Sequence, residues 1–407
     1  MEEKDFIKEK IVGQKGSWKK RGKKVILLFL SGMIFSLGAF LTAAFLFPLL
    51  PKTEKKKEKE TVAFSESEST EVESSTEETE AIEDVVQSEI QKFDFPISAY
   101  DSMMGNLKNI IQEGEKSLVD VEISSGGADL LTKEKKQGNG IILEKTGDSL
   151  FVLFPWNSEE GEEYRVRFFR EKEVEGTKVS ESKKDGILIL SVPLSAFNEK
   201  EMEKLSLIPR GNSRLLQRGE TLIGIGAPSG KLYSTVFSYV SYLSYEEPAI
   251  DGILEEIELQ LAERGEGNIF FLNTAGQLVG FARGSEESYP RITGLSDCLE
   301  YLARLSNGNA LPYLGIRVQN TTKKMAELGI PEGIYISEVE EGSPAYNAGI
   351  QPGDVLKKGN GEELSSVKTF QEALLKQNPG EIYRITVLRY NGKEYVELEF
   401  SCPLGTR

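Results

Sequence analysis

The longest apolar run of the chain covers residues 25–50 and contains no charged side chain. As an α-helix it would extend roughly 39 Å, at about 1.5 Å per residue, which is enough to cross a ~30 Å hydrocarbon core with some tilt. A cleaved signal peptide usually has a shorter apolar run and a small-residue cleavage site, whereas this run ends in Pro48, Leu49, Leu50 and Pro51. The pattern therefore predicts a transmembrane signal anchor.

Both flanks of this run are charged. Residues 1–24 carry nine Lys or Arg against four acidic residues, which favours a cytoplasmic N-terminus, although five lysines within residues 51–60 weaken that asymmetry. Residues 61–90 hold ten acidic residues and no basic one, a composition that cannot offset the entropy of ordering. We expect a basic cytoplasmic segment at 1–24 and a disordered linker over 51–92, first Lys/Glu-rich and then Ser/Glu-rich. The bulk of the chain would then lie outside the cytoplasm, at the cell membrane.

Regular structure is predicted to resume near Phe93. Apolar residues recur with a helical period from Met103 to Ile111, and Gly114 is expected to end this helix. An apolar strand pattern follows from Leu118 to Ile123. The next β-type runs, separated by turns, lie at residues 140–145, 149–156, 164–171, 186–192, 221–228 and 233–244. Many short strands without long helices between them predict an all-β barrel or sandwich.

The end of this β region, near residue 292, contains a hairpin signal. In residues 265–284, GEGNIFFLNTAGQLVGFARG, an apolar strand at Ile269–Leu272 and a returning strand at Gln277–Ala282 flank the turn Asn273–Gly276. The acidic stretch just before it, residues 246–263, is interpreted as a solvated face that is partly helical or lies at a sheet edge.

The composition narrows the possible chemistry. The formal net charge of −16 argues against a nucleic-acid partner, because neutralising phosphates requires clustered Lys and Arg. The chain has no histidine, so no imidazole can serve as a general base or a metal ligand. We expect neither a metal nor a cofactor. Cys298 and Cys402 do not make a disulfide framework, and Cys298 is expected to be a small buried apolar side chain.

A second module follows the β region, after a helix predicted at Leu295–Leu305 and a linker. It runs from about residue 313 to 401 and contains the pattern SPA-x-x-AGI-x-x-GD at Ser343–Asp354. A helix at 366–377 and a hairpin come after this pattern. The order closely resembles a PDZ domain of the bacterial protease type.

The PDZ resemblance implies a binding loop and a groove. Backbone N–H groups of the loop would bind the terminal carboxylate of a peptide, which adds as a strand. The loop residues are Tyr313, Leu314, Gly315 and Ile316. Gly315 would let the backbone approach the ligand closely. Thr369 and Ala373 lie one helical turn apart, so they either line the groove or form a solvent-exposed helix side.

Fragments of the β region resemble, in order, the HtrA-type (DegP-like) trypsin-like serine proteases. The matching fragments are residues 137–154, 183–192, 218–241 and the hairpin at 265–284. The resemblance covers roughly residues 93–401. It implies a mainly β fold, in which a trypsin-like double β-barrel at 93–306 is followed by an α+β PDZ domain at 307–407.

The same resemblance implies where a catalytic triad would lie. The positions of the aspartate, the nucleophilic serine, the histidine and an oxyanion-hole donor are taken by Asp185, Gly267, Asn157 and Gly265. Glycine offers no hydroxyl, and asparagine cannot accept a proton near neutral pH. Losing either group alone costs on the order of 10⁶ in turnover. No intact catalytic residue is therefore expected, and Asp185 is expected to be a structural carboxylate.

These features favour a membrane-anchored extracytoplasmic pseudoprotease whose PDZ domain binds C-terminal or unfolded peptides, as a scaffold or adaptor in envelope protein quality control. The alternative is an active serine endopeptidase of this family that uses a non-standard group, such as a Ser–Lys dyad. A third reading is a partner of an active homologue in a mixed oligomer. In the resembling family, aromatic residues near Phe93, Phe95 and Tyr100 help to build trimers, so these three residues indicate either a homotrimer or local packing of the entry helix.

Overall fold

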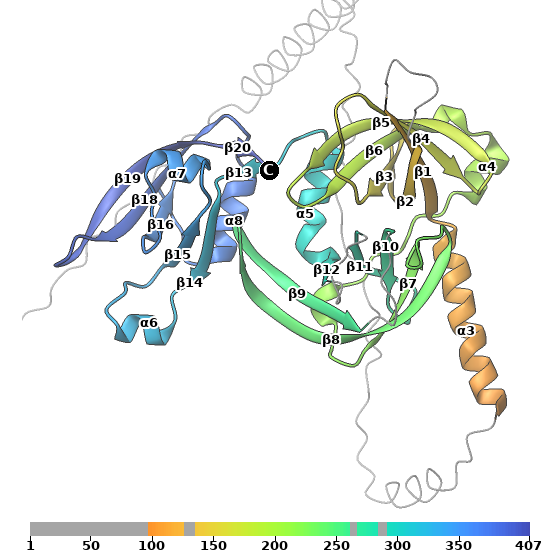
Figure 1. The fold of residues 1–407 in the computed structure, drawn as a ribbon, viewed down its shortest axis with the longest axis horizontal. Helices are drawn as coiled ribbons and strands as arrows, with labels where there is room; N and C mark the ends of the chain where they lie inside the picture. The colour runs from red at the N-terminus through yellow and green to blue at the C-terminus, as the bar shows by residue number, and fades with distance from the viewer. Residues whose placement is uncertain (1–96, 126–134, 261–266, 284–290) are drawn as a thin grey trace, which may run out of the picture. The chain divides into compact units, whose positions relative to one another are not determined.

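The structure, a computed structural model, describes residues 97–125, 135–260, 267–283 and 291–407 (Figure 1). Several sequence expectations lie outside these ranges, namely the segments 1–24, 25–50 and 51–92 together with Phe93, Phe95 and Gly265. Within the described ranges, no helix is both long and apolar enough to cross a membrane.

The described chain begins with helix α3 (Ile97–Glu115) and a closed antiparallel barrel. The strands of this first barrel are β1 (Leu118–Ser125), β2 (Lys135–Thr146), β3 (Ser149–Phe154), β4 (Glu162–Phe168), β5 (Lys172–Ser182) and β6 (Ile187–Pro193). Hydrogen-bonded neighbours follow the order β1-β2-β3-β6-β5-β4, and β1 closes the barrel against β4. Its interior is filled by inward-facing apolar side chains such as Val121, Val152 and Val166.

A second closed barrel follows after three short helices, η2 (Leu194–Ala196), α4 (Glu199–Lys204) and η3 (Ser213–Leu215). Its strands are β7 (Thr221–Gly226), β8 (Ser234–Ala249), β9 (Gly252–Gln260), β10 (Ile269–Leu272), β11 (Leu278–Ala282) and β12 (Arg291–Gly294). They pair in the order β10-β11-β12-β9-β8-β7. Strands β8 and β9 form a long hairpin whose two-residue connection is Ile250 and Asp251.

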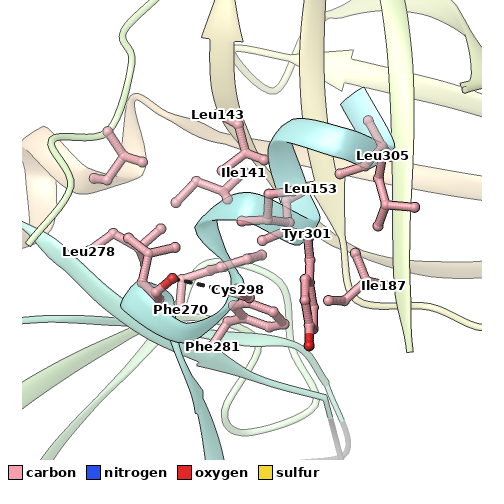
Figure 2. Close-up of a cluster of buried hydrophobic side chains, with 14 of the residues drawn as sticks. Ile141, Leu143, Leu153, Ile187, Phe270, Leu278, Phe281, Cys298, Tyr301 and Leu305 are labelled. Atoms are coloured by element: carbon pink, nitrogen blue, oxygen red, sulfur yellow. Dashed lines mark hydrogen bonds between the residues drawn. The ribbon is translucent and has the colours of Figure 1, made fainter. Parts of the chain in front are cut away.

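One apolar cluster joins the two barrels to helix α5 (Leu295–Ser306), as Figure 2 shows. Ile141 and Leu153 come from the first barrel, Phe270 comes from the second, and Cys298 and Tyr301 come from α5. All of these side chains are buried, so the amphipathic helix seals the junction between the barrels.

The remaining chain forms a sheet with the order β14-β15-β16-β18-β19, in which β17 also pairs with β16. Its strands are β14 (Ile316–Asn320), β15 (Ile334–Val339), β16 (Val355–Gly359), β17 (Glu362–Glu363), β18 (Ile382–Tyr390) and β19 (Tyr395–Pro403). The helices are α6 (Lys323–Glu327), α7 (Pro344–Ala348) and α8 (Val367–Leu375), and a small separate pair joins β13 (Pro312–Tyr313) to β20 (Gly405–Thr406). Strand β14 lies at one edge of the larger sheet.

The local sequence predictions agree with these elements in most places. The hairpin predicted at Ile269–Ala282 and the helix predicted at Leu295–Leu305 are both present. The helix predicted to end at Gly114 runs to Glu115. A Cβ atom at Gly114 would lie 2.7 Å from Leu272 Cδ1, so this glycine allows α3 to pack closely on the second barrel.

The interpretation of residues 246–263 as a solvated face that is partly helical or lies at a sheet edge is wrong for Asp251 and Glu255 and for the place of this stretch in the sheet, whereas Glu246 is exposed. Most of this stretch belongs to strands β8 and β9, which are inner members of a closed barrel rather than a helix or a sheet edge. Asp251 and Glu255 are only 2% and 6% exposed. The buried Glu255 accepts a hydrogen bond of 2.6 Å from Ser213 Oγ. This bond offsets part of the cost of removing the carboxylate from water.

Candidate functional site

Gly267, which the family resemblance predicts at the position of the nucleophilic serine, is packed directly against Ala227. A Cβ atom at Gly267 would lie 2.4 Å from Ala227 Cβ and 2.7 Å from the Ala227 carbonyl oxygen. The approach is fixed by backbone pairing, because the Ala227 N–H donates to the Asn268 carbonyl at 2.8 Å. The backbone therefore leaves no room for a side chain at this position.

Asn157, which the family resemblance predicts at the position of the histidine, lines a cavity of about 300 Å³ together with Gly267 and Arg283. We call this the Asn157 cavity. With its amide oriented to suit both neighbours, the nitrogen donates to the Lys183 carbonyl at 2.9 Å and the oxygen accepts from Arg283 Nη1 at 3.0 Å. Both ends of the amide are thus used in hydrogen bonds, and neither can accept a proton as a general base would.

Asp185, which the family resemblance predicts at the position of the triad aspartate, lines a different cavity together with Lys184, Glu340 and Arg407 among others. The Arg407 guanidinium binds it bidentately, with Nε to Oδ2 at 2.7 Å and Nη2 to Oδ1 at 2.9 Å. The Ser182 hydroxyl also donates to Asp185. Burial lowers the pKa of Arg407, but its contacts with Asp185 raise that pKa by more. The structure thus places Asn157 and Gly267 at one cavity and ties Asp185 to Arg407 at another.

A serine and a lysine do meet next to Asn157. Lys178 Nζ donates to Ser158 Oγ at 2.7 Å and to Glu181 Oε1 at 2.5 Å, while Ser158 Oγ donates to Glu181 Oε2 at 2.6 Å. Burial raises the pKa of Glu181, yet the hydrogen bonds from Lys178 and Ser158 hold it below its ordinary value. Glu181 accepts from both Lys178 and Ser158, which is the geometry of an ion pair with a bound hydroxyl, whereas in a Ser–Lys dyad the serine hydroxyl would donate to the lysine.

The loop formed by Tyr313, Leu314, Gly315 and Ile316, which we call the carboxylate loop, binds a carboxylate in this structure. The amide of Leu314 donates to Asp251 Oδ2 at 2.8 Å. The amides of Gly315 and Ile316 donate to Asp251 Oδ1 at 2.9 and 3.1 Å. Gly315 has a φ of +87°, and a Cβ atom there would lie 2.3 Å from Ser343 Cβ, so only glycine fits.

Asp251 is buried where it meets the carboxylate loop. Burial raises the pKa of this carboxyl group, an effect that the amide donors and the Arg407 guanidinium oppose. Its own N–H donates to the Ile316 carbonyl at 2.7 Å, and Ile250 forms an antiparallel bridge with Arg317. The carboxylate loop and the start of β14 thus bind both the Asp251 carboxylate and the extended backbone at Ile250 and Asp251.

The two groove residues predicted on α8 have different surroundings. Thr369 forms a capping box with Ser366, in which the Ser366 N–H donates to Thr369 Oγ1 at 3.0 Å. Ala373 is half-buried and packs against the apolar core of this module. Helix α8 also packs on strand β9 of the second barrel.

Further polar contacts hold the last module against the barrels. Lys184 Nζ lies 2.6 Å from Glu340 Oε2, 3.1 Å from the Tyr313 hydroxyl and 4.3 Å from the centre of the Tyr313 ring. Arg304 of α5 donates to the carbonyls of Leu375 and Gln377 at 2.5 and 2.6 Å. Burial lowers the pKa of Arg304. Like the Asp251 contact, these contacts join the last module to the barrels and to α5.

Among the described residues, no group of three or more Cys, Asp or Glu side chains is arranged to hold a metal ion. Cys298 and Cys402 are both buried free thiols. Cys298 lies in the apolar cluster between the barrels, as expected, and its Sγ donates to the Leu295 carbonyl at 3.3 Å.

Sequence reasoning missed Asp251, although a signal was present. The dipeptide Asp251-Gly252 joins two runs with strand character, which is a strong short-range hairpin signal. Recognising the turn would have predicted the hairpin. The partner of the turn, 63 residues further along the chain at Leu314, has no local signature.

The comparisons with known proteins agree with this architecture. Residues 312–400 match the family described as PDZ domain. A probable periplasmic serine endoprotease, DegP-like, of Hahella chejuensis is 26% identical over 64% of this chain and 56% of its own length. The serine protease Do-like HtrB of Bacillus subtilis is 25% identical over 70% of this chain and 68% of its own.

The solved structures resemble this chain in fold. The HtrA-type protease AlgW with tripeptide has a TM-score of 0.52 at 19% identity, covering 74% of this chain and 97% of that one. The matched region spans only about half of the first curated relatives, 56% and 50% of their lengths. The fold is therefore a trypsin-like double barrel followed by a PDZ domain.

Proposed function

Starting from this homology to HtrA- and DegP-type serine proteases, we propose that the protein is a pseudoprotease that binds the C-termini of other polypeptides through its PDZ domain. One observation carries the proposal. Three backbone amides of the carboxylate loop converge on a single carboxylate, at donor–acceptor distances of 2.8 to 3.1 Å. Such convergent donors are what a peptide terminus requires.

The proposed lack of proteolytic activity is supported by the contacts of the three residues predicted at the triad positions. Gly267 is closed against Ala227, and the Asn157 amide is used in hydrogen bonds. Asp185 is bound to Arg407. Acyl transfer needs a nucleophile beside a base that a carboxylate orients, and these residues offer no such chain of contacts.

The setting of the function follows from the sequence and from the relatives. Residues 25–50 would anchor the protein in the cell membrane, with residues 1–24 in the cytoplasm and residues 51–92 as a spacer. Two of the relatives are described as probable periplasmic endoproteases, which supports an extracytoplasmic location for the barrels and the PDZ domain. The protein would then act there as a scaffold or adaptor in protein quality control, as a homotrimer or in a mixed oligomer with an active homologue.

Peptide binding is tested with the full-length protein in detergent. Fluorescent decapeptides with randomised sequences are offered with a free C-terminus and, as the matched control, with a C-terminal amide. We expect some free-carboxylate peptides to bind at least about tenfold more tightly than their amides, because the amide lacks the charge that the loop amides receive. Equal binding of acids and amides, or no binding by any peptide, would contradict the proposal.

Proteolysis is tested on the same preparation. A fluorophosphonate probe and a quenched protein substrate should show no labelling and no cleavage above a buffer control. Labelling of a single serine that disappears when that serine is replaced by alanine would establish the active endopeptidase instead.

A further inference from the structure

The carboxylate loop already holds a carboxylate supplied by the same chain. Asp251, at the tip of the β8–β9 hairpin, accepts hydrogen bonds from the amides of Leu314, Gly315 and Ile316 and is 2% exposed. A peptide terminus would need these same donors. The two carboxylates therefore cannot occupy the loop together.

The backbone of the hairpin tip also takes the place of a bound peptide strand. Asp251 N–H donates to the Ile316 carbonyl at 2.7 Å, and Ile250 pairs with Arg317 in an antiparallel bridge. Arg317 Nη1 donates to the Pro248 carbonyl at 2.7 Å. Strand β14 is an edge strand of the PDZ sheet, and edge strands are where peptides add by β-augmentation.

The other wall of the groove is occupied as well. Ile253 is half-buried and packs against the PDZ core. Gly252 lies against Gln371 of α8, since a Cβ atom there would be 2.7 Å from the Gln371 Cδ. The hairpin tip thus contacts both β14 and α8 and supplies a carboxylate, a backbone strand edge and an apolar side chain.

We propose that residues 249–253 are an internal ligand of the PDZ groove, and that an external C-terminus binds only when this hairpin tip has left. The inference rests on the proposed peptide-binding function. The tip is held by hydrogen bonds and apolar contacts rather than by a covalent link, so its displacement is reversible. The apparent dissociation constant of an external peptide then equals its intrinsic value divided by the fraction of molecules with an open groove.

The test compares Asp251→Asn with the unmodified full-length protein, using the fluorescent decapeptides with free and amidated C-termini. Asparagine keeps the size of the side chain and tolerates the φ of +62° at this position, but it removes the charge. We expect the variant to bind free-carboxylate peptides on the order of tenfold more tightly. Glu246→Gln is the matched control, because Glu246 is an exposed acid on the same hairpin, and it should leave affinity unchanged.

A second measurement does not depend on any variant. In the unmodified protein, the Asp251 amide should exchange its hydrogen faster at saturating peptide, since peptide binding breaks its hydrogen bond to Ile316. Full protection of this amide in the peptide complex would overturn the internal-ligand inference. This measurement decides the question if Asp251→Asn does not fold.

The outcomes separate the two proposals. Equal affinity of the unmodified protein and a folded Asp251→Asn variant would overturn the internal ligand and leave peptide binding intact. Absence of binding to either protein would overturn both. A gain in affinity that is confined to free-carboxylate peptides would support both.

Discussion

The Asn157 cavity and the carboxylate loop differ in what each has kept. At the cavity, Asn157 uses both ends of its amide in hydrogen bonds, and the backbone at Gly267 lies against Ala227. At the loop, the amides of Leu314, Gly315 and Ile316 all donate to Asp251. A position without room for a side chain does not accept one by a single substitution, whereas an occupied loop can be vacated. The cavity and the loop therefore call for different experiments.

The largest effect is expected from Arg407→Met, which breaks the contact between Asp185 and the PDZ side. Removing one partner of a largely buried ion pair leaves the other uncompensated, and we expect a loss of about 3 kcal/mol in the free energy of unfolding. The shift of the urea midpoint measures it. The control is Arg218→Met at an exposed position, which should change the midpoint little. An unchanged midpoint for Arg407→Met would show that Asp185 is not held by this pair.

Gly267→Ser tests whether the Gly267 position, at the edge of the Asn157 cavity, has room for a side chain. The new side chain meets Ala227 at 2.4 Å, so we expect a destabilisation of about 2 kcal/mol and no fluorophosphonate labelling. Adding Asn157→His should not create labelling. Gly105→Ser is the matched control, because no atom lies within 4 Å of a Cβ at Gly105. A stable Gly267→Ser variant that reacts with the probe would show that this position has room for a reactive serine side chain.

Ser158→Ala addresses the Ser–Lys contact beside the same cavity. Removing a hydroxyl that bonds Lys178 and Glu181 should cost about 1 kcal/mol of stability and leave the protein as inert to the probe as before. Exposed Ser365→Ala should cost less than about 0.5 kcal/mol. Loss of a pre-existing probe signal in Ser158→Ala would instead identify a nucleophile.

The rates at which Cys298 and Cys402 react with a thiol reagent compare the opening of the barrels with the opening of the PDZ domain. Burial raises the pKa of Cys402, in the PDZ core, to about 11, and it also raises the pKa of Cys298, between the barrels. At pH 8 only about one Cys402 in a thousand is a thiolate, so the native protein should react with a disulfide reagent far more slowly than the unfolded chain. Rapid labelling of Cys402 alone would show that the PDZ domain opens before the barrels.

Local patterns made the PDZ module readable from sequence. In Ser343–Asp354, several residues have roles in the local backbone structure. Ser343 caps α7 by accepting from Tyr346 N–H, and Gly349 ends that helix with a φ of +91°. Such turn and cap chemistry depends on neighbours only a few residues away, so the sequence displays it.

The occupant of the carboxylate loop could not be read in the same way. Docking of the hairpin tip depends on how the second barrel and the PDZ domain contact each other. The periodicity of apolar residues predicts helices and strands, but it does not predict such a contact between domains. The burial of two acidic residues in the stretch from 246 to 263 is hidden from the sequence for a related reason. Buried Glu255 looks like any other acid in the sequence until Ser213, 42 residues away, is known to donate to it.

Arg407 contacts both Asp185 and the hairpin tip. Two of its nitrogens hold Asp185, and a third, Nη1, donates to the Ile250 carbonyl of the hairpin tip at 2.9 Å. Any movement that frees the hairpin must therefore break a contact of the guanidinium that binds Asp185. In a double-mutant cycle, substitutions at Asp185 and Asp251 should show a non-additive effect on peptide affinity, although no contact joins the two aspartates directly.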